Sequence, residues 1–489
     1  MSWTLLLPPL LPLAGVVVTA LLRERAAAVA AVLTALATAA ASVAVVLLVV
    51  AEGPLAYALS GWSPPLGIEV RADGLSAVLL AMTALVGVAV TWYATADTKL
   101  LGGRGGWPLW LALWSGLNVV YVSGDLFNIY IGLELLSIAA VALVAGGGAT
   151  ARRGAMRYLV VAVAGSLLFL LGVGLLYGQT GTLDVLQVGA RLQAGPEVLV
   201  ALTAVVAGMA MKTALFPVHG WLPPAHSAAP AAVSPILSAL VVKASFYVLV
   251  RLWFDVFGPL VPSGAGLALG VLGALAVAWG AALALRQTHL KRVVAYSTVA
   301  QLGYLFLLFP LATPALTGGA QDAETARLAW LGVFGLLMAH GVAKSAMFLA
   351  AGTVAAGYGT DELAELRGAV AAMPVPMFAF GIAGVSLAGL PPSFGFLGKW
   401  NLLQASLGSG QWWWLLVLMG GGLGTAAYTA RVLRLTYSGP DDDVEPPELA
   451  PVRRRTQLVP LLLAVVAVGV GLGSGRLLEL SLVGVGGAP

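Results

Sequence analysis

The chain has 489 residues, of which 60% are hydrophobic and only 9% are charged, and its mean hydropathy is +0.96. Soluble globular chains carry about 25% charged residues, so this composition does not supply a water-facing surface. Cysteine is absent, which excludes disulfides, iron–sulfur clusters and thiolate metal sites, and the four histidines are too scattered to favour a dedicated metal site. The composition predicts a polytopic helical membrane protein.

We predict an all-α fold of about 14 transmembrane helices, because the chain contains that many apolar runs near the 20-residue length that crosses a bilayer. The runs lie at 3–22, 26–51, 73–95, 107–123, 125–146, 155–178, 198–217, 232–257, 263–285, 292–311, 328–352, 374–400, 411–437 and 457–475. No basic residue precedes Arg23, so the first run is interpreted as a retained span rather than a signal peptide. We expect a single transmembrane domain over 1–489.

Charges between the apolar runs predict the orientation of the chain. The odd-numbered connections carry 16 Lys and Arg residues, whereas the termini and the even-numbered connections carry 5. This bias predicts cytoplasmic odd-numbered loops, an even number of spans and both termini outside the cytoplasm. The longest polar connection, 438–456, contains Asp441, Asp442 and Asp443 and then three arginines, and we interpret it as a solvated loop rather than a docking site.

Two of the expected spans are interrupted by proline. The seventh contains Pro217, Pro223 and Pro224, and the twelfth contains Pro391 and Pro392. Proline removes a helical donor, and in a bilayer the freed carbonyl groups are tolerated only where protein or water covers them. Paired broken helices are typical of transporters built from inverted repeats, although kinks that only shape the packing remain an alternative.

Ionisable residues inside the apolar runs are few. Glu134 is the only acid deep in a run, since Asp73, Asp125 and Asp255 stand at segment ends where we expect water to reach them. A charge at the bilayer centre costs roughly 2.5–3.5 kcal/mol on insertion scales, which favours a functional role. A single bridge between Glu134 and Lys212 that only joins two helices is the structural alternative.

Lysine and arginine are distributed differently along the chain. Most of the arginines lie between the runs, whereas Lys212, Lys243, Lys344 and Lys399 lie inside them. Arginine stays protonated, while a desolvated lysine can release its proton, so the lysines indicate proton transfer. Lys399 is near the end of its span, where it can alternatively reach the membrane interface.

The histidines divide into candidates and one loop residue. His340 precedes Lys344 by four positions and therefore shares its helix face. His219 and His226 flank the proline break, where they extend the proton path or hydrogen-bond freed backbone groups; the sequence leaves both readings open. His289 is interpreted as a loop residue. No catalytic triad, phosphate loop or metal-ligand spacing stands out, so we expect no enzyme and no cofactor.

Three motifs resemble a known family. The segments SGDLFNIYIGLELL, MKTALFPVHGWLPPAHSAAPAAVSPILSALVVKASFYVLVR and GLPPSFGFLGKW are similar to the proton-translocating antiporter-like subunits of respiratory complex I, membrane-bound hydrogenases and Mrp cation/proton antiporters. The similarity covers roughly 70–440. The similarity is greatest to the D-type subunit of the Mrp antiporters, judged by the GDLFN and GQTGTLD segments and by the length of the chain. The lateral helix typical of complex I subunit L is not expected.

The resemblance implies roles for matching positions. Glu134 corresponds to the family's glutamate on the fifth helix, Lys212 to the lysine of the broken seventh helix, Lys243 to the bridging lysine of the eighth helix and Lys399 to the lysine of the twelfth. His340 and Lys344 match the eleventh helix more loosely. Complex I subunit M usually has glutamate at the twelfth-helix position, so Lys399 favours other members of the family.

The resemblance therefore implies a proton-translocating subunit of a multi-subunit Na⁺/H⁺ antiporter in the cell membrane, with its core at about 107–437. Its partners would be other Mrp subunits, protons, Na⁺ or a similar cation, and lipid, with no nucleic acid; the metal-cation site is not identified. One alternative is an M- or N-like proton-pumping subunit of complex I or a hydrogenase. Another is a structural subunit without transport activity.

Overall fold

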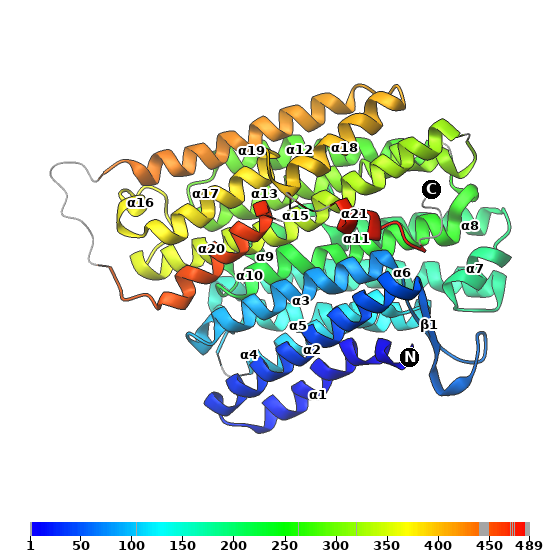
Figure 1. The fold of residues 1–489 in the computed structure, drawn as a ribbon, viewed down its shortest axis with the longest axis horizontal. Coiled ribbons are helices and arrows are strands. Elements are labelled where there is room, and N and C mark those ends of the chain that lie inside the picture. Colours follow the sequence, from blue (N-terminus) through cyan, green and yellow to red (C-terminus); the bar gives the residue numbers. More distant parts are fainter. Residues whose placement is uncertain are drawn as a thin grey trace.

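The computed structural model describes residues 2–103, 105–262, 264–318, 320–439, 449–469, 471, 473 and 475–484. The described chain is a bundle of helices that run mostly along its long axis, as Figure 1 shows. The acidic run Asp441–Asp443 lies outside the described residues, so its prediction as a solvated loop stays a prediction.

Each of the longer helices overlaps one of the predicted apolar runs. In chain order they are α1 (Leu7–Leu21), α2 (Glu24–Glu52), α3 (Gly74–Ala94), α4 (Gly106–Val122), α5 (Leu126–Ala145), α6 (Ala149–Thr180), α8 (Pro196–Thr213), α11 (Val242–Arg251), α12 (Ala265–Arg286), α13 (Leu290–Leu305), α15 (Ala320–Tyr358), α17 (Pro374–Ala388), α18 (Phe394–Gly408), α19 (Trp414–Tyr437) and α20 (Arg454–Gly469).

Short helical segments and one hairpin join them. The helical segments are η1 (Ser2–Leu6), η2 (Leu59–Gly61), η3 (Thr98–Leu101), α7 (Val185–Arg191), η4 (Val218–Trp221), α9 (Leu222–Ala228), α10 (Val233–Ile236), η5 (Leu237–Val241), η6 (Leu252–Phe257), η7 (Gly258–Leu260), α14 (Leu308–Ala312), η8 (Thr313–Leu316), α16 (Ala369–Ala372) and α21 (Gly475–Leu480). The strands β1 (Leu55–Ala58) and β2 (Glu69–Ala72) pair antiparallel, a hairpin that the sequence analysis did not predict.

The all-α membrane fold is confirmed. In the described part of the chain, 11 helices are long and apolar enough to cross a membrane. The remaining predicted spans correspond to α4, to the pair α17 and α18, and to α20, whose helices are 15 to 17 residues long. The count of 14 spans therefore stays a prediction.

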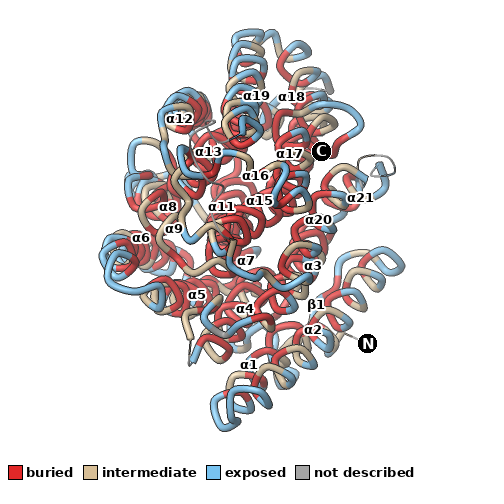
Figure 2. Tube along the Cα trace, turned by 90° about the vertical axis from the view of Figure 1, so that its left-hand side faces the viewer, coloured by how far each residue is buried: buried red, intermediate tan, exposed pale blue. Residues whose placement is uncertain are grey.

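Burial separates a central layer from a lipid-facing layer. In Figure 2, which looks along the bundle, α11 and α15 lie near the centre, whereas α1, α2, α6, α12 and α19 lie at the periphery with exposed outer faces. These outer faces carry large apolar side chains, such as Leu33 at 62% and Leu423 at 70% exposure. Apolar exposure of this extent is unusual against water and suits contact with lipid.

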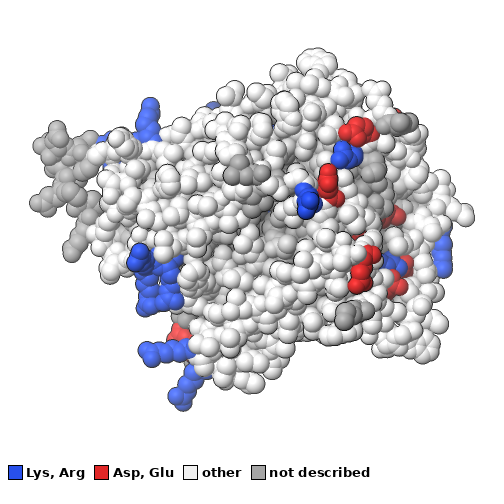
Figure 3. All heavy atoms as spheres, in the orientation of Figure 1, with Lys and Arg blue, Asp and Glu red and all other residues white. Residues whose placement is uncertain are grey.

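The two ends of the bundle differ in charge. The basic end carries arginines at the turn between α1 and α2 and at the starts of α6 and α20. The hairpin end carries β1–β2, α7 and the start of α3, where the N–H of Gly74 donates to the carbonyl of Val483 at 2.8 Å. On the face shown in Figure 3, basic side chains gather mainly at the left-hand end and acidic ones at the other. We expect the basic end to face the cytoplasm.

Aspartates begin three helices at the hairpin end. The carboxylate of Asp73 accepts from the N–H of Ser76 at 3.0 Å, and that of Asp125 accepts from Asn128 at 2.9 Å. Asp184 caps α7 in the same way. A side-chain oxygen at this position satisfies a backbone donor that the helix leaves free, which explains why these helices start where they do.

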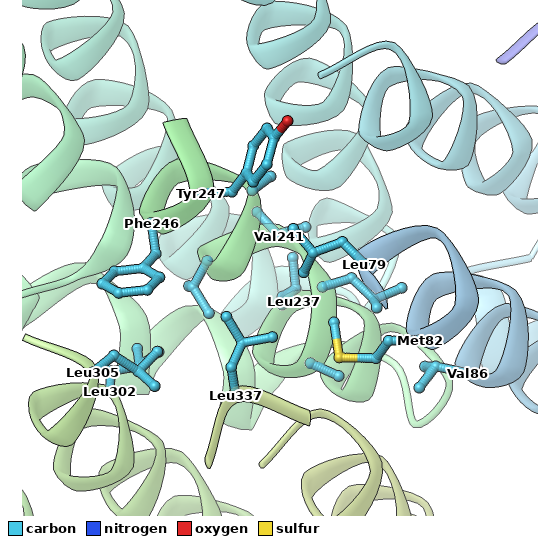
Figure 4. Close-up of a cluster of buried hydrophobic side chains, with 14 of the residues drawn as sticks. Leu79, Met82, Val86, Leu237, Val241, Phe246, Tyr247, Leu302, Leu305 and Leu337 are labelled. Atoms are coloured by element: carbon cyan, nitrogen blue, oxygen red, sulfur yellow. The ribbon is translucent and has the colours of Figure 1, made fainter. Parts of the chain in front are cut away.

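The core fills the space between α3, α11, α13 and α15. Figure 4 shows part of it, with Leu79 and Met82 of α3 facing Leu237 and Val241 of η5. All four side chains are buried. The cluster of buried apolar side chains to which they belong extends along the chain from Leu5 to Leu480, and it surrounds the polar groups described next.

Candidate functional site

Glu134 and Lys212 form an ion pair between α5 and α8. The Lys212 ammonium lies 3.6 Å from the Glu134 carboxylate and donates to the hydroxyl of Ser137 at 3.0 Å. The hydroxyl of Ser166, on α6, donates to the same carboxylate. The Lys212 side chain is 3% exposed, whereas that of Glu134 is 24% exposed. Glu134 therefore lies at the edge of the protein interior, and Lys212 lies within it.

The helix carrying Lys212 ends one residue later. Ala214 adopts a left-handed conformation with φ of 58°, and the N–H groups of Ala214 and Leu215 donate to the carbonyls of Met211 and Ala210 at 3.2 and 3.0 Å. The indole N–H of Trp221 donates to the Met211 carbonyl as well, at 2.9 Å. Two carbonyl groups at the break, those of Ala210 and Met211, are thus bonded within the protein, as a membrane interior requires.

The break between α17 and α18 repeats this arrangement. Gly389 has φ of 82°, and the N–H groups of Gly389 and Leu390 donate to the carbonyls of Ser386 and Val385 at 3.1 and 3.2 Å. The spacing of donors and acceptors is the same as at Ala214. Both predicted interruptions are therefore present, and the helix before each break ends in the common C-terminal motif in which a left-handed residue closes the last turn.

Lys243 and His340 meet at the centre of the bundle. The Lys243 ammonium lies 2.7 Å from Nδ1 of His340, which comes from α15, and it donates to the carbonyl of Ser238 at 2.8 Å. Neither side chain is more than 2% exposed. Because one nitrogen lies at hydrogen-bond distance from the other, a proton on either group can be shared with its partner.

Lys344 lies one helical turn after His340 and faces α13. Its ammonium donates to the carbonyl of Val294 at 3.1 Å and to the hydroxyl of Ser297. Lys344 is fully buried and lies within electrostatic reach of Lys243. His340 and Lys344 thus lie on one face of the helix, as predicted. Both side chains point into the same buried region.

Lys399 lies beside the second break and is buried in the protein. Its ammonium donates to the carbonyl of Ala388 at 2.8 Å and lies 4.9 Å from the centre of the Tyr304 ring. The residue is 9% exposed. Of the two positions that the sequence left open for Lys399, the structure has the buried one, with a carbonyl freed by the helix break as its acceptor.

The two histidines at the first break have different surroundings. His226 is fully buried against Trp221 and Phe348, and neither ring nitrogen has a hydrogen-bond partner in the described part of the chain. It lies within electrostatic reach of Lys243, Lys344 and Lys291. His219 stacks on Phe216, with ring centres 5.6 Å apart. Only His226 therefore faces the buried lysines.

Sequence reasoning missed Lys291. We assigned it to a loop together with Arg292, but its side chain is buried and its ammonium donates to the carbonyl of Ala229. We placed Lys291 in the loop because an arginine follows it. A lysine at the start of a helix can nevertheless reach the protein interior with its long aliphatic side chain, so the neighbouring arginine did not indicate a solvated position. His289, expected in the same loop, is 35% exposed and lies 3.1 Å from a carboxylate oxygen of Asp361.

Asp255 is more buried than expected of a residue at a segment end. The Asp255 side chain is 6% exposed and pairs with Arg251 at 3.3 Å. Arg251, one of the five basic residues counted for the termini and the even-numbered connections, is 11% exposed and also pairs with Asp73. The i, i+4 spacing of Arg251 and Asp255 was the signal available in the sequence.

Comparison with known proteins identifies the family of the chain. The family described as "NADH:quinone oxidoreductase/Mrp antiporter, TM" matches residues 123–424, which include every candidate named above. The chain belongs to this family. It is 36% identical over 396 residues to NADH-quinone oxidoreductase subunit N of Desulforudis audaxviator, across 78% of this chain and 75% of that protein.

A second relative and a solved structure come from antiporters. The chain is 30% identical over 368 residues to the D-type subunit of the Na⁺/H⁺ antiporter of Bacillus subtilis, across 74% of this chain and 72% of that one. It matches a chain in the structure of the Mrp complex from Dietzia sp. DQ12-45-1b with a TM-score of 0.86 and 25% identity, across 100% of this chain and 96% of that one. These antiporter-family relatives are subunits of larger assemblies, which supports a hetero-oligomeric assembly for this chain.

Proposed function

We propose that the chain is the proton-translocating subunit of a multi-subunit antiporter that exchanges Na⁺, or a similar monovalent cation, for protons across the cell membrane. Protons would move along the buried row of Glu134, Lys212, Lys243, His340 with Lys344, and Lys399. The similarity to the D-type antiporter subunit and to the Mrp complex supports the antiporter assignment.

The contact between Lys243 and His340 is the observation that carries this proposal. Two nitrogen bases 2.7 Å apart in a fully buried region have no structural advantage over an apolar pair of similar size. They can, however, hold and pass on a proton. Lys344, within electrostatic reach of both, supplies a further base in the same region.

Charge repulsion would couple the steps of transfer. When Glu134 is ionised, its carboxylate 3.6 Å away stabilises the charged form of Lys212. Protonation of Glu134 removes that stabilisation, so Lys212 releases its proton more readily toward Lys243. A proton arriving at Lys243 in turn repels positive charge on Lys344. Each transfer therefore changes the proton affinity of the next group in the row.

The row needs access to water on both sides of the membrane. At the basic end, Lys291 lies within electrostatic reach of His226, and His226 within reach of Lys243 and Lys344, which makes these residues candidates for cytoplasmic access. His219 is a weaker candidate because it faces Phe216. The chemistry requires no cofactor, since the membrane potential supplies about 2.3 kcal/mol per charge per 100 mV.

Antiport in everted membrane vesicles tests the proposal. Cation-dependent proton movement would be measured on addition of Na⁺, Li⁺ and K⁺ in turn, for the whole complex with wild-type chain and with Lys212→Ala. We expect Lys212→Ala to abolish antiport while the complex still assembles. Full antiport in an assembled Lys212→Ala complex would show that the row does not carry protons, and would leave the chain a structural subunit.

A second candidate function is that of an N-like proton-pumping subunit of a redox complex. The 36% identity to NADH-quinone oxidoreductase subunit N favours it. Purification of the complex under mild conditions distinguishes the two assemblies. Partner subunits with flavin or iron–sulfur absorbance would support the redox complex, whereas small hydrophobic partners without such absorbance would support the antiporter.

A further inference from the structure

A cavity of about 380 Å³ lies at the hairpin end of the bundle, and none of the lysines of the row lines it. It is bounded by the two strands of the hairpin, the start of α3 and the end of α11. Ionisable side chains line it, namely Glu69, Arg71, Asp73, Arg251 and Asp255. Neither the helix breaks nor the proton row described above accounts for this concentration of charge.

A ladder of polar side chains joins the cavity to the centre of the protein. Lys243, Tyr247, Arg251 and Asp255 follow one another at intervals of four residues along α11 and η6. Four residues advance a helix by about 6 Å and return to nearly the same face. The ladder therefore begins at the Lys243–His340 contact and ends at the cavity.

Hydrogen bonds link the middle of the ladder to α3. The hydroxyl oxygens of Tyr247 and Ser76 lie 3.1 Å apart, and the Tyr247 hydroxyl also lies 3.1 Å from the carbonyl of Tyr121. Figure 4 shows this hydroxyl pointing away from the apolar cluster that surrounds the tyrosine ring. Ser76 and Tyr247 both line the cavity, and Tyr247 lies one helical turn after Lys243, so the two hydroxyl groups adjoin the cavity next to the buried row.

Asp255 has one carboxylate oxygen that the protein does not use. Its Oδ2 accepts from Arg251 at 3.3 Å, whereas Oδ1 is buried and has no hydrogen-bond partner among the described residues. The side chain is 6% exposed and lines the cavity. Buried oxygens of this kind are usually satisfied, so the free oxygen is available to a partner that enters from the cavity.

Charge favours protons in the cavity. Three carboxylates and two guanidinium groups line it, and Arg71 is further neutralised by Asp184 at 3.0 Å. Acid groups are therefore in excess around the cavity. A recess lined by an excess of one charge raises the local concentration of the opposite charge, here of protons and cations.

We propose that this cavity is a proton vestibule for the hairpin face of the membrane. The Asp255 carboxylate takes up a proton from the aqueous side of the cavity and then, as the carboxylic acid, passes it to the hydroxyl groups. The hydroxyl groups of Ser76 and Tyr247 each accept one proton and release one, and the Lys243 amine or the His340 imidazole accepts the last. The number of protons in the relay is unchanged, and the reverse order releases a proton. The inference rests on the proposed function, because the vestibule serves the buried row.

Two substitutions test the relay in the assembled complex. Tyr247→Phe removes the hydroxyl and keeps the ring, which contacts Arg251 and Tyr121. Asp255→Asn keeps an acceptor for Arg251 and cannot ionise. We expect each to lower the initial rate of antiport about tenfold or more, as loss of a proton-relay group does. Tyr93→Phe is the matched control, because Tyr93 is buried and bonded to Thr353 at 3.0 Å, and its rate should stay within about twofold of wild type.

Labelling tests whether the cavity opens to water on the hairpin face. The chain has no cysteine, so Ser123→Cys, at the cavity wall, introduces the only thiol of this subunit. We expect a membrane-impermeant, positively charged thiol reagent to modify it from the hairpin side alone and to block antiport. Modification from neither side, or from the basic side alone, would overturn the vestibule.

Lys212→Ala, measured in the same vesicles, separates the two proposals. If Lys212→Ala abolishes antiport while Tyr247→Phe and Asp255→Asn both work at wild-type rates, the vestibule is wrong and the proton row stands. If Lys212→Ala retains the full rate, the proposed function itself fails. Should Asp255→Asn prevent assembly, Tyr247→Phe and the labelling of Ser123→Cys still decide the question.

Discussion

Lys243 of α11 and His340 of α15 lie 2.7 Å apart, nitrogen to nitrogen, although 97 residues separate them in the chain. Both are buried by apolar side chains, and the Lys243 ammonium has the Ser238 carbonyl as its other acceptor. A charged lysine in this position loses its hydration and gains only two hydrogen bonds. The contact is therefore costly as a structural feature and well suited to holding a mobile proton.

Replacement of the histidine should separate these two roles. We expect His340→Gln to lower the initial antiport rate about tenfold or more, because glutamine can accept from Lys243 and cannot carry a proton. Proton movement in vesicles, normalised to the amount of assembled complex, measures this. His289→Gln is the control, since His289 is partly exposed and pairs with Asp361 at the basic end. Equal rates for the two variants and wild type would contradict a role for His340 in proton transfer.

Substitutions at Lys399 test whether this residue must release its proton or need only carry a positive charge. Lys399→Arg keeps a cation near the Ala388 carbonyl and the Tyr304 ring, but the guanidinium stays protonated. We expect Lys399→Arg to assemble with a thermal stability close to wild type and to lose antiport about as fully as Lys399→Met. If the arginine variant transports at the wild-type rate while the methionine variant does not, fixed charge alone is sufficient at this position.

Most helix positions were predictable because the bilayer imposes both length and composition on a span. The expected run 73–95 corresponds to α3 at Gly74–Ala94, and 411–437 to α19 at Trp414–Tyr437. The proline breaks were predictable for the same reason, since few other residues interrupt an apolar helix. The hairpin of β1 and β2 was not, because β1 shows no alternation of polar and apolar residues and the alternation in β2 lasts only four residues.

The partners of the buried groups were less accessible to sequence analysis. The positions of the lysines in the apolar runs indicated which of them enter the membrane. The contact of Lys344 with Ser297, by contrast, depends on how α15 packs against α13. The same holds for Arg251 and Asp73, which come together across α11 and α3. Long-range packing decided these contacts, and spacing along the chain indicated only the local pair Arg251–Asp255.

The hydroxyl of Ser297 should stabilise the charged form of Lys344. A hydrogen bond to a charged group contributes roughly 1.5–3 kcal/mol, and Ser297→Ala leaves Lys344 with the Val294 carbonyl as its acceptor in the described structure. We expect lower thermal stability of the purified complex and a several-fold slower rate. Ser345→Ala is the matched control, because Ser345 is buried on the same helix as Lys344 and bonds only to the carbonyl of Gly341. Similar losses in both variants would point to packing alone.

The matching helix breaks allow a paired test of local geometry. A Cβ atom at Gly389 would lie 2.6 Å from Cδ of Lys399, and the residue has φ of +82°. Gly389→Ala therefore adds about 1–2 kcal/mol of backbone strain and pushes Lys399 away from the Ala388 carbonyl, so we expect a several-fold loss of antiport.

Ala214, at the equivalent position of the first break, already has φ of 58°. Ala214→Gly removes that strain, and its melting temperature should equal or exceed that of wild type with the rate retained. Loss of antiport in Ala214→Gly to the same extent as in Gly389→Ala would mean that the breaks respond to any change in backbone stiffness, and that contact with Lys399 is not the cause.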